Sequence, residues 1–380
     1  MSGTHDTSGT DATDGETNSA DGTDGTNRTP RKDRKDRKAP PAPSDTPSPP
    51  VARPLPQRLL VGATGLFLLA ATVLLGCRAL GSDGVTPVPQ LLAFLPWLLV
   101  PAALALLLTA LLRWRAGVVW ALVVTGAVGW FLRPYETGTG PEVRAAGAVS
   151  GSGGTAPTTL KVLTSNVEFG QAASGLADAI RREKPDLIFV QECEFGCTRL
   201  LDERIPAADY PYRNMVRASG AEGSSILSRF PLTDTAGLPG TLAMPGSAAH
   251  IGDRTVQLQL AHPLPPIPGM VDDWRTELGR IRDYAATQKA AGAPLILAGD
   301  FNATRDHAVF RALLDAGRLR DSALLAGAGH TPSWPSDVPR PLGAQIDHVL
   351  VSDDFSVRSA RFLDLADTDH RSLLVTLELH

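Results

Sequence analysis

The sequence predicts an α/β domain of mixed β-sheets flanked by helices, preceded by an apolar membrane region and a polar tail. Three observations predict this organisation. The first 50 residues contain almost no apolar side chains, charged residues nearly vanish between 59 and 133, and after residue 158 strand-like and helix-like hydrophobic patterns alternate. We therefore expect four segments, which are a tail (1–58), an apolar region (59–133), a linker (134–157) and a folded domain (158–380).

The tail is predicted to be disordered and cytoplasmic. Gly, Ser, Thr, Asp and Pro dominate it, so it buries too little apolar surface to offset the entropy of ordering. All six charges from Asp6 to Asp24 are negative, whereas residues 28–38 form a basic block. A nucleic-acid-binding tail would carry such a block, but we favour the flank of a membrane helix because an apolar span follows.

Three uncharged runs interrupt the chain between residues 59 and 133. They contain 19, 29 and 17 residues, bounded by Arg58 and Arg78, Asp83 and Arg113, and Arg115 and Arg133. Since about 20 apolar residues cross a bilayer as a helix, we predict three transmembrane helices near 59–76, 91–112 and 116–132. No charge lies within a span, which favours plain anchors over a transporter.

The basic residues predict the orientation. They precede the first span and recur as Arg113 and Arg115 between the second and third, so both places are expected to be cytoplasmic. Three crossings then place the following domain outside the cell. Residues 74–77 resemble a lipoprotein cleavage box, but a signal sequence is less favoured because the preceding tail is too long. Residues 134–157 are rich in Gly, Ser and Thr and predict a flexible tether.

The folded domain is predicted from its hydrophobic periods. We expect strands near 160–163, 187–190, 254–261, 295–298, 345–351, 356–364 and 371–379, and helices near 171–184, 271–291 and 307–316. This order, with consecutive strands at the end, predicts packed mixed sheets with helices on their outer faces.

Polar side chains follow the predicted strands at six places. They are Asn166, Gln191-Glu192, His262, Asp300 with Asn302, Asp347 and Asp369-His370. One such residue alone would be a turn or surface residue, but six at strand ends predict a site, because loops beyond strands hold functional groups on a rigid scaffold. Oxygen ligands without a His or Cys cluster favour Mg²⁺, Mn²⁺ or Ca²⁺ over zinc.

These segments resemble the signature motifs of a known family. Leu163-Thr-Ser-Asn, Val190-Gln-Glu, Ala261-His-Pro, Gly299-Asp-Phe-Asn, Gln345-Ile-Asp-His and Thr368-Asp-His are similar to those of the endonuclease/exonuclease/phosphatase superfamily. The resemblance covers about 158–380 and implies the DNase I-like fold, a four-layer α/β/β/α sandwich. It also implies metal-dependent cleavage of a phosphoester. Thr368 stands where the family more often has Ser, which keeps a small hydroxyl.

The resemblance implies a metal site. Glu192, assisted by Asn166, resembles the main ligand of Mg²⁺ (or Mn²⁺), and Asp369 is a second candidate ligand. A hard carboxylate is the ligand type that these ions prefer.

It also implies five catalytic residues. Asp300 would orient or deprotonate the attacking water, and Asn302 would donate hydrogen bonds to a phosphoryl oxygen. His370 would neutralise the phosphate or protonate the leaving oxygen, with its imidazole held by Asp347. His262 matches the other histidine of the family.

The sequence alone allows a structural reading of several neighbouring residues. His348 is expected to be structural, because it points to the other face of its strand from Asp347. Trp334 resembles the family's aromatic loop but is equally suited to packing. Cys193 and Cys197 either form a short disulfide or remain two buried thiols.

The charge balance and the layout favour a lipid-linked substrate. Residues 151–380 contain 28 acidic and 22 basic residues, which does not favour long polyanions such as nucleic acid. A membrane-anchored domain of this kind resembles the VanJ-type teicoplanin-resistance proteins, which implies a polyprenyl (undecaprenyl) pyrophosphate phosphatase at the cell membrane. The alternative enzyme is a cell-surface endonuclease or exonuclease. A degenerate membrane-bound binding module is disfavoured because the catalytic residues are intact.

Overall fold

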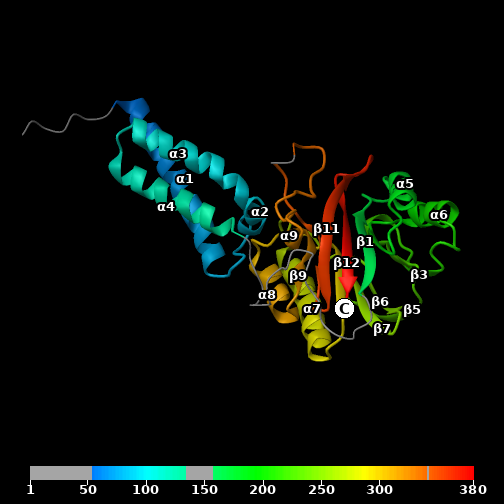
Figure 1. Cartoon of the computed structure of the whole chain (residues 1–380). Helices are drawn as coiled ribbons and strands as arrows, with labels where there is room; N and C mark the ends of the chain where they lie inside the picture. The colour runs from blue at the N-terminus through cyan, green and yellow to red at the C-terminus, as the bar shows by residue number, and fades with distance from the viewer. Residues whose placement is uncertain (1–53, 134–156, 340–341) are drawn as a thin grey trace, which may run out of the picture. The chain divides into compact units, whose positions relative to one another are not determined.

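The structure of the protein, a computed structural model, describes residues 54–133, 157–339 and 342–380 (Figure 1). The predicted disordered tail and flexible tether lie outside these residues, except at their edges.

The apolar region is helical. Its elements are α1 (Leu55–Ala79), α2 (Val88–Ala93), the 3₁₀ helix η1 (Leu95–Leu98), α3 (Leu99–Leu111) and α4 (Arg115–Phe131). Small and aliphatic side chains such as Leu68, Ala102 and Val124 pack together between the helices. Large aliphatic side chains such as Leu66 and Leu107 remain exposed on their outer faces, at 69% and 55%.

One of the described helices is long and apolar enough to cross a membrane. This is α1, with 25 residues. The other two apolar segments, Leu95–Leu111 and Arg115–Phe131, are shorter than 18 residues. At 1.5 Å per residue, 17 residues span about 26 Å, less than the roughly 30 Å of a hydrocarbon core. The prediction of three full-length spans is therefore met by the first alone.

The predicted second span is not one continuous helix. Residues 91–112 are divided between α2, η1 and α3, with the break at Phe94 (φ −108°, ψ 25°). Pro96 follows this break and has no backbone N–H to donate, so the chain turns tightly there before α3 begins. Pro89 is buried in the short helix α2.

The C-terminal domain contains two six-stranded sheets. In the first sheet the strand order is β11-β12-β1-β2-β4-β3, and in the second it is β5-β6-β7-β8-β10-β9. The strands are β1 (Thr158–Asn166), β2 (Leu187–Gln191), β3 (Tyr212–Val216), β4 (Ser224–Ser228), β5 (Leu232–Leu238), β6 (Met244–Ile251), β7 (Arg254–Ala261), β8 (Leu295–Asp300), β9 (Arg320–Asp321), β10 (Asp347–Val351), β11 (Phe355–Asp364) and β12 (Arg371–Leu379). The helices are α5 (Ala173–Glu183), α6 (Phe195–Arg204), the 3₁₀ helix η2 (Gly220–Glu222), α7 (Val271–Ala290), α8 (Ala308–Gly317) and α9 (Ser322–Leu325).

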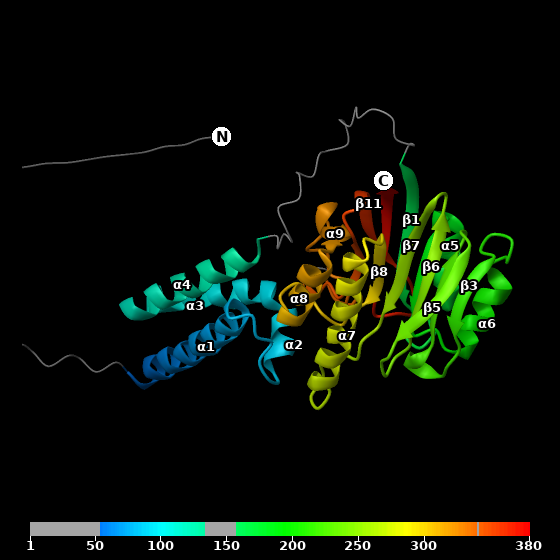
Figure 2. The same ribbon diagram turned by 90° about the horizontal axis from the view of Figure 1, so that it is seen from below.

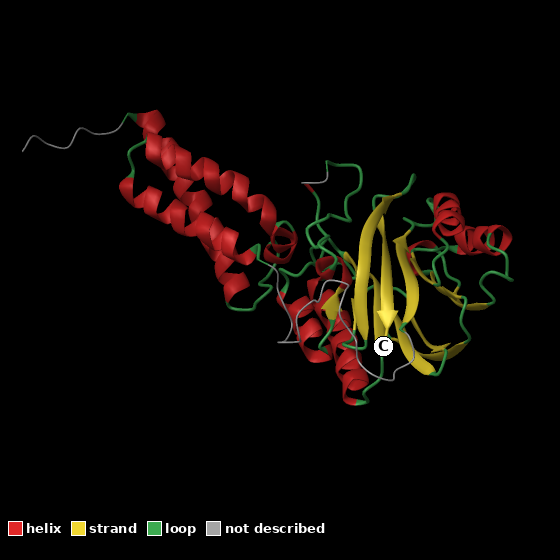
Figure 3. Ribbon diagram, in the orientation of Figure 1, coloured by secondary structure: helices red, strands yellow, loops and turns green. Residues whose placement is uncertain are grey.

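The two sheets pack face to face, with helices outside them (Figures 1 and 2). The central core joins inward side chains of both sheets, including Val162, Leu258 and Val375. A second apolar cluster lies between the first sheet and α5 and α6, and a third between the second sheet and α7 and α8. The strands in Figure 3 therefore lie between helical layers on both sides. The predicted two-sheet sandwich is confirmed.

The helical region contacts the C-terminal domain through the segment between α1 and α2. The carboxylate of Asp83 accepts hydrogen bonds from the first backbone N–H groups of α8, those of Ala308 (2.6 Å) and Val309 (3.0 Å). The neighbouring His307 donates from Nε2 to the carbonyl of Pro89, at 2.8 Å. Direct hydrogen bonds thus join the helical region to the C-terminal domain.

Candidate active site

The polar side chains predicted at the strand ends meet at one edge of the two sheets. Within the first sheet Asn166 lies opposite Gln191, and within the second Asp300 lies opposite Asp347. The amide of Asn166 donates from Nδ2 to Oδ2 of Asp300 at 3.2 Å, which links the two sheets. These four side chains are buried and form the enclosed part of a polar cluster.

His370 lies between two carboxylates. Its Nδ1 is 2.9 Å from Oδ2 of Asp347, and its Nε2 is 3.8 Å from Oδ2 of Asp300. Burial lowers the pKa of His370, but the charges of Asp347 and Asp300 outweigh it and raise that pKa to about 10. The imidazole is therefore positively charged at neutral pH, as the predicted role in neutralising a phosphate requires.

Asp300 is suited to exchange a proton near neutral pH. Burial raises its pKa to about 7, an effect that Asp347 reinforces and the positive charge of His370 opposes. Its Oδ1 accepts a hydrogen bond from the backbone N–H of Asn302 at 2.8 Å. This arrangement fits the expected role of a base that activates water.

Asn302 differs in part from its expected role. Its side-chain Nδ2 donates to the backbone carbonyl of Pro263 at 3.0 Å, and its backbone carbonyl accepts from Nε1 of Trp274 at 3.1 Å. The residue adopts a positive φ of 48°, a conformation that Asn tolerates better than most residues. In this structure one amide hydrogen of Asn302 holds the loop that begins at Pro263, so the side chain does not offer both amide hydrogens to a phosphate.

Glu192 is the carboxylate best placed to hold a metal. Its Oε1 accepts from Nδ2 of Asn166 (2.9 Å), its Oε2 accepts from the backbone N–H of Phe169 (3.1 Å), and its side chain is 16% exposed. Asn166 directs its amide nitrogen to this carboxylate, while its Oδ1 accepts from the backbone N–H of Glu168. Asn166 therefore positions Glu192 here and does not present its oxygen as a ligand.

His262 is buried beside Glu192. Burial and the positive charge of His370 lower its pKa to about 3, so it is neutral. Its Nε2 lies 3.8 Å from Oε1 of Glu192, and its Nδ1 has no hydrogen-bond partner among the described residues. Oδ1 of Asp347 is likewise unpartnered. Buried polar atoms without a hydrogen-bond partner are uncommon. A bound ligand would supply the partner that Nδ1 of His262 and Oδ1 of Asp347 lack.

Asp369 lies at the rim of the cluster, with its side chain 41% exposed. Its Oδ2 accepts from Nε1 of Trp334 at 2.7 Å, and its Oδ1 is 3.7 Å from Nε2 of His370. The backbone N–H of Asp369 donates to Oε2 of Glu168 at 2.7 Å. Glu168 was not predicted, and the one signal in the sequence was its position two residues after Asn166.

His348 lies apart from this cluster. Its Nδ1 is 3.0 Å from Oδ2 of Asp321, its Nε2 is 3.0 Å from the carbonyl of Ala303, and its ring packs against Phe301 and Phe310. Both ring nitrogens are thus engaged within the core of the domain, which is a structural role.

The donor set fits a hard divalent cation. Asp300, Asp347 and His370 each offer a ligand atom within 4.8 Å of the others. We do not assign the metal to His370, because its Nδ1 is engaged by Asp347 and its positive charge repels a cation. The carboxylates of Glu192 and Asp300 instead converge on one neutral amide, that of Asn166. Two such carboxylates are the ligand type that Mg²⁺ or Mn²⁺ takes.

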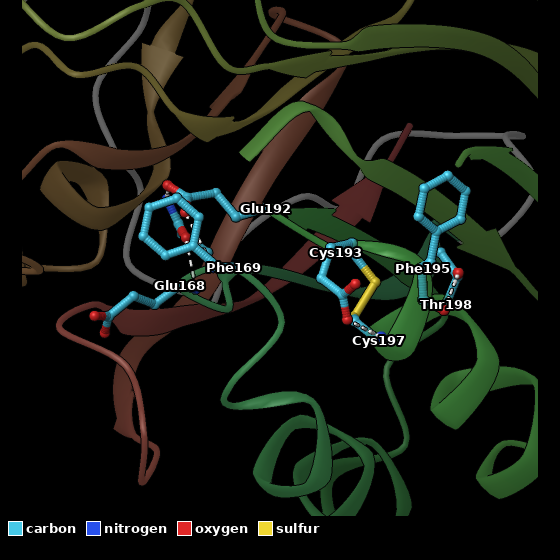
Figure 4. Close-up of a disulfide and its surroundings, with 9 residues drawn as sticks. Glu168, Phe169, Glu192, Cys193, Phe195, Cys197 and Thr198 are labelled. Carbon is cyan, nitrogen blue, oxygen red and sulfur yellow. Dashed lines mark hydrogen bonds between the residues drawn. A yellow bond between two sulfur atoms is a disulfide. The ribbon is translucent and has the colours of Figure 1, made fainter. Parts of the chain in front are cut away.

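A disulfide follows Glu192 directly (Figure 4). It joins Cys193 to Cys197, four residues apart. The side chain of Glu194 accepts from the backbone N–H of Cys197 at 3.1 Å and so caps the start of α6. Glu192 itself adopts a left-handed conformation, with φ 57°. The disulfide restrains the chain immediately beyond this residue, and it resolves the alternative left open by the sequence.

The two-sheet fold and the buried Asp-His-Asp cluster define a hydrolase of the phosphoesterase type. A model of the Endonuclease/Exonuclease/phosphatase family matches residues 163–370, more than half of the chain. The chain therefore belongs to this family, as the motifs predicted. Members of the family are hydrolases and typically depend on a divalent metal.

Solved structures with similarity to this chain come from several organisms. A humanized TDP2 of D. rerio has 16% identity and a TM-score of 0.48, covering 58% of this chain and 98% of its own. The AP endonuclease LMAP of Leishmania major has 15% identity and a TM-score of 0.49, covering 58% and 88%. A family protein of Bacteroides thetaiotaomicron has 18% identity and a TM-score of 0.43, covering 59% and 99%. No curated protein matches the sequence.

Proposed function

We propose that the protein is a membrane-anchored hydrolase that cleaves a phosphoester or pyrophosphate bond with a divalent metal, outside the cytoplasm. The proposed hydrolase activity rests on the array of Asp300, His370 and Asp347 beside Glu192. It brings a proton acceptor, a positive charge and a metal-binding carboxylate to one place.

In this mechanism the residues have separate tasks. Asp300 takes a proton from the attacking water, since its pKa of about 7 permits this near neutral pH. His370 places a positive charge against the phosphate and can return a proton to the leaving oxygen, while Asp347 fixes its ring. Glu192, positioned by Asn166, would hold the metal, with Asp369 as a second candidate ligand. A bound Mg²⁺ or Mn²⁺ would act as a Lewis acid on the phosphoryl oxygen.

The orientation depends on whether the number of membrane crossings is odd or even. α3 and α4 are joined by the short turn 112–114, so they cross a membrane together or not at all. With the basic flank before α1 in the cytoplasm, either one or three crossings leave the C-terminal domain outside. We favour three crossings, because both shorter helices expose apolar faces. Each of these helices is a few ångströms shorter than the hydrocarbon core, and local thinning of the bilayer accommodates such a difference. The Cys193–Cys197 disulfide supports an oxidising compartment.

The favoured substrate is a lipid-linked phosphate, with a polyprenyl pyrophosphate as the leading example. Anchored domains meet membrane substrates at high local concentration, and the acidic charge of this domain does not favour nucleic acid. A cell-surface nuclease is the second candidate, since a metal can neutralise the phosphate locally.

The test is a substrate panel. Full-length protein in nanodiscs with Mg²⁺ is given undecaprenyl pyrophosphate, sphingomyelin, an inositol phosphate, and single- and double-stranded DNA. We expect the polyprenyl pyrophosphate to be hydrolysed at least tenfold faster than the rest, with Asp300→Asn inactive on it. Preferred cleavage of DNA would replace this proposal by the nuclease.

A further inference from the structure

A cavity with several charged lining residues lies between the apolar helices and the C-terminal domain. Its volume is about 110 Å³. The helical region lines it with Arg78, Trp97 and Arg133, and the C-terminal domain with Arg305 and His330. We call this cavity the junction pocket.

Two of its arginines are nearly buried and have limited acidic partners. Nε of Arg78 pairs with Oδ1 of Asp306 at 3.0 Å, with side-chain exposures of 10% and 15%. Arg305, with its side chain 13% exposed, donates to the carbonyl of Gly329 and stands 4.0 Å from Asp321. Asp321 is itself bound to a histidine, so Arg305 is only weakly neutralised.

The third arginine adds to this excess. The guanidinium of Arg133 stacks over the ring of Trp130 at 4.4 Å, and no described carboxylate forms an ion pair with it. Burial and the charge of Arg305 lower the pKa of His330, which leaves that side chain neutral. Among the described lining residues, three guanidinium groups therefore face one carboxylate, that of Asp306. Arg133 is exposed, whereas the guanidinium groups of Arg78 and Arg305 are nearly buried. Nearly buried guanidinium groups are stabilised by an anion, and phosphate oxygens match the geometry of a guanidinium group.

The pocket lies at the ends of the apolar helices. Arg78 is in the last turn of α1, and Arg133 follows α4 directly. Trp97, in the 3₁₀ helix η1 directly before α3, directs its Nε1 toward the carbonyl of Gly343 at 3.4 Å. Arg and Trp at the end of a membrane helix are typical of the level of the lipid headgroups.

The pocket also shares its loops with the candidate active site. Arg305 lies three residues after Asn302, and Gln345, another lining residue, lies two residues before Asp347. Oε1 of Gln345 is buried without a hydrogen-bond partner, so it can accept from a hydroxyl group.

We infer that the junction pocket binds a phosphate group, distinct from the one that is hydrolysed, through Arg78, Arg133 and Arg305. The phosphate belongs either to the headgroup of an anionic lipid or to free phosphate. The lipid source rests on the proposed membrane location, whereas phosphate recognition does not.

The test measures binding of inorganic phosphate to the full-length protein in zwitterionic nanodiscs by calorimetry. Excess chelator is present so that the metal-dependent site is silent. Arg133→Gln is the first variant, because this side chain is exposed and forms no ion pair with a described carboxylate, so its loss should not disturb folding. Arg305→Gln is the second, and Arg282→Gln, an exposed arginine of α7, is the matched control. We expect each pocket variant to weaken phosphate binding about tenfold, the effect of one charge-assisted hydrogen bond.

A second arm distinguishes the source. Nanodiscs of phosphatidylglycerol are compared with nanodiscs of phosphatidylcholine. If a lipid headgroup fills the pocket, phosphatidylglycerol abolishes phosphate binding in the wild type; if free phosphate fills it, binding is equal in both. Either result supports the pocket. Equal phosphate affinity in wild type, Arg133→Gln and Arg305→Gln would overturn the inference.

The outcome is independent of the proposed function. The same preparations are assayed with Mg²⁺ for hydrolysis of the substrate panel. Arginine-dependent phosphate binding without any hydrolysis would leave the pocket standing and remove the proposed function, and hydrolysis without such binding would do the reverse.

Discussion

At the scale of single residues, the candidate site depends on opposed environments for neighbouring groups. Burial raises the pKa of Asp300 to about 7, whereas two carboxylates raise that of His370 to about 10. A proton acceptor and a fixed positive charge thus lie 3.8 Å apart. Separation of this kind between two titratable groups is the basis on which we propose Asp300 as the base and His370 as the acid.

The pairing of Asp347 with His370 predicts a non-additive pair of mutations. His370→Ala should lower turnover by about 10² to 10⁴, and Asp347→Asn by less, because it removes the orientation of the ring but not the ring itself. The double variant should lose little more than His370→Ala alone, since an orienting residue then has nothing to orient. Steady-state kinetics check this. Losses that multiply would show that the two residues act independently.

At the scale of elements, the loop after β2 and the start of α8 are each held by specific bonds. The disulfide restrains the first, and Asp83 with His307 restrains the second. Each contact suggests one test of how the fold supports the site.

Removal of the disulfide should weaken metal binding. The double change Cys193→Ser and Cys197→Ser frees the backbone beside Glu192, and the chain-entropy model gives a loss of about 2 kcal/mol in the free energy of unfolding for so short a loop. We expect weaker Mn²⁺ binding by electron paramagnetic resonance, with Cys77→Ser, at the free cysteine, as the control. Unchanged Mn²⁺ affinity would mean that the disulfide does not position Glu192.

Acidification should loosen the contact between α8 and the helical region. Burial lowers the pKa of His307 below its ordinary 6.5, although Asp83 and the Pro89 carbonyl oppose this. The unfolded state therefore binds the proton more readily, so this stabilisation is complete above pH 6.5 and declines as the pH falls below it. Nδ1 of His307 accepts a hydrogen bond from the backbone N–H of Thr304 at 2.9 Å, and protonation of the imidazole would break this bond.

Hydrogen exchange of the first amides of α8 between pH 7.5 and 5.5 measures this effect, after correction for intrinsic exchange. Protection should fall with pH in the wild type, and His307→Gln should remove the pH dependence. His250→Gln, at an exposed histidine, is the control. Protection that does not change with pH in the wild type would contradict the assignment.

The strong elements of the sandwich could be predicted from the sequence, and the weak ones could not. β7 and α7 carry clean hydrophobic periods and lie where the sequence places them, at Arg254–Ala261 and Val271–Ala290. β6 was missed because its residues, Met244–Ile251, include Pro, Gly and Ser and take their stability from pairing with β5 and β7. The contacts of Glu168 with Asp369, and of Asn166 with Glu192 and Asp300, join segments far apart in the sequence, so no local pattern contains them.

At the scale of the whole molecule, we propose an apolar anchor that carries a hydrolytic domain. Both crossing numbers considered above place the C-terminus outside the cytoplasm. A reporter enzyme that is active outside the cytoplasm alone, fused after His380, should therefore be active in intact cells. An inactive fusion, together with an active cytoplasmic reporter at the same position, would refute the orientation and the argument for a lipid-linked substrate.

We propose that this fold hydrolyses a phosphate bond with a metal held by Glu192 and a water activated by Asp300. The most direct measurement is phosphate release by full-length protein in nanodiscs, with the best substrate of the panel, in Mg²⁺ and then in excess chelator. We expect release in Mg²⁺, loss in chelator with recovery on adding Mg²⁺ or Mn²⁺, and rates lowered by at least about 10² in Asp300→Asn and Glu192→Gln. Full activity in chelator, or in either variant, would contradict the claim.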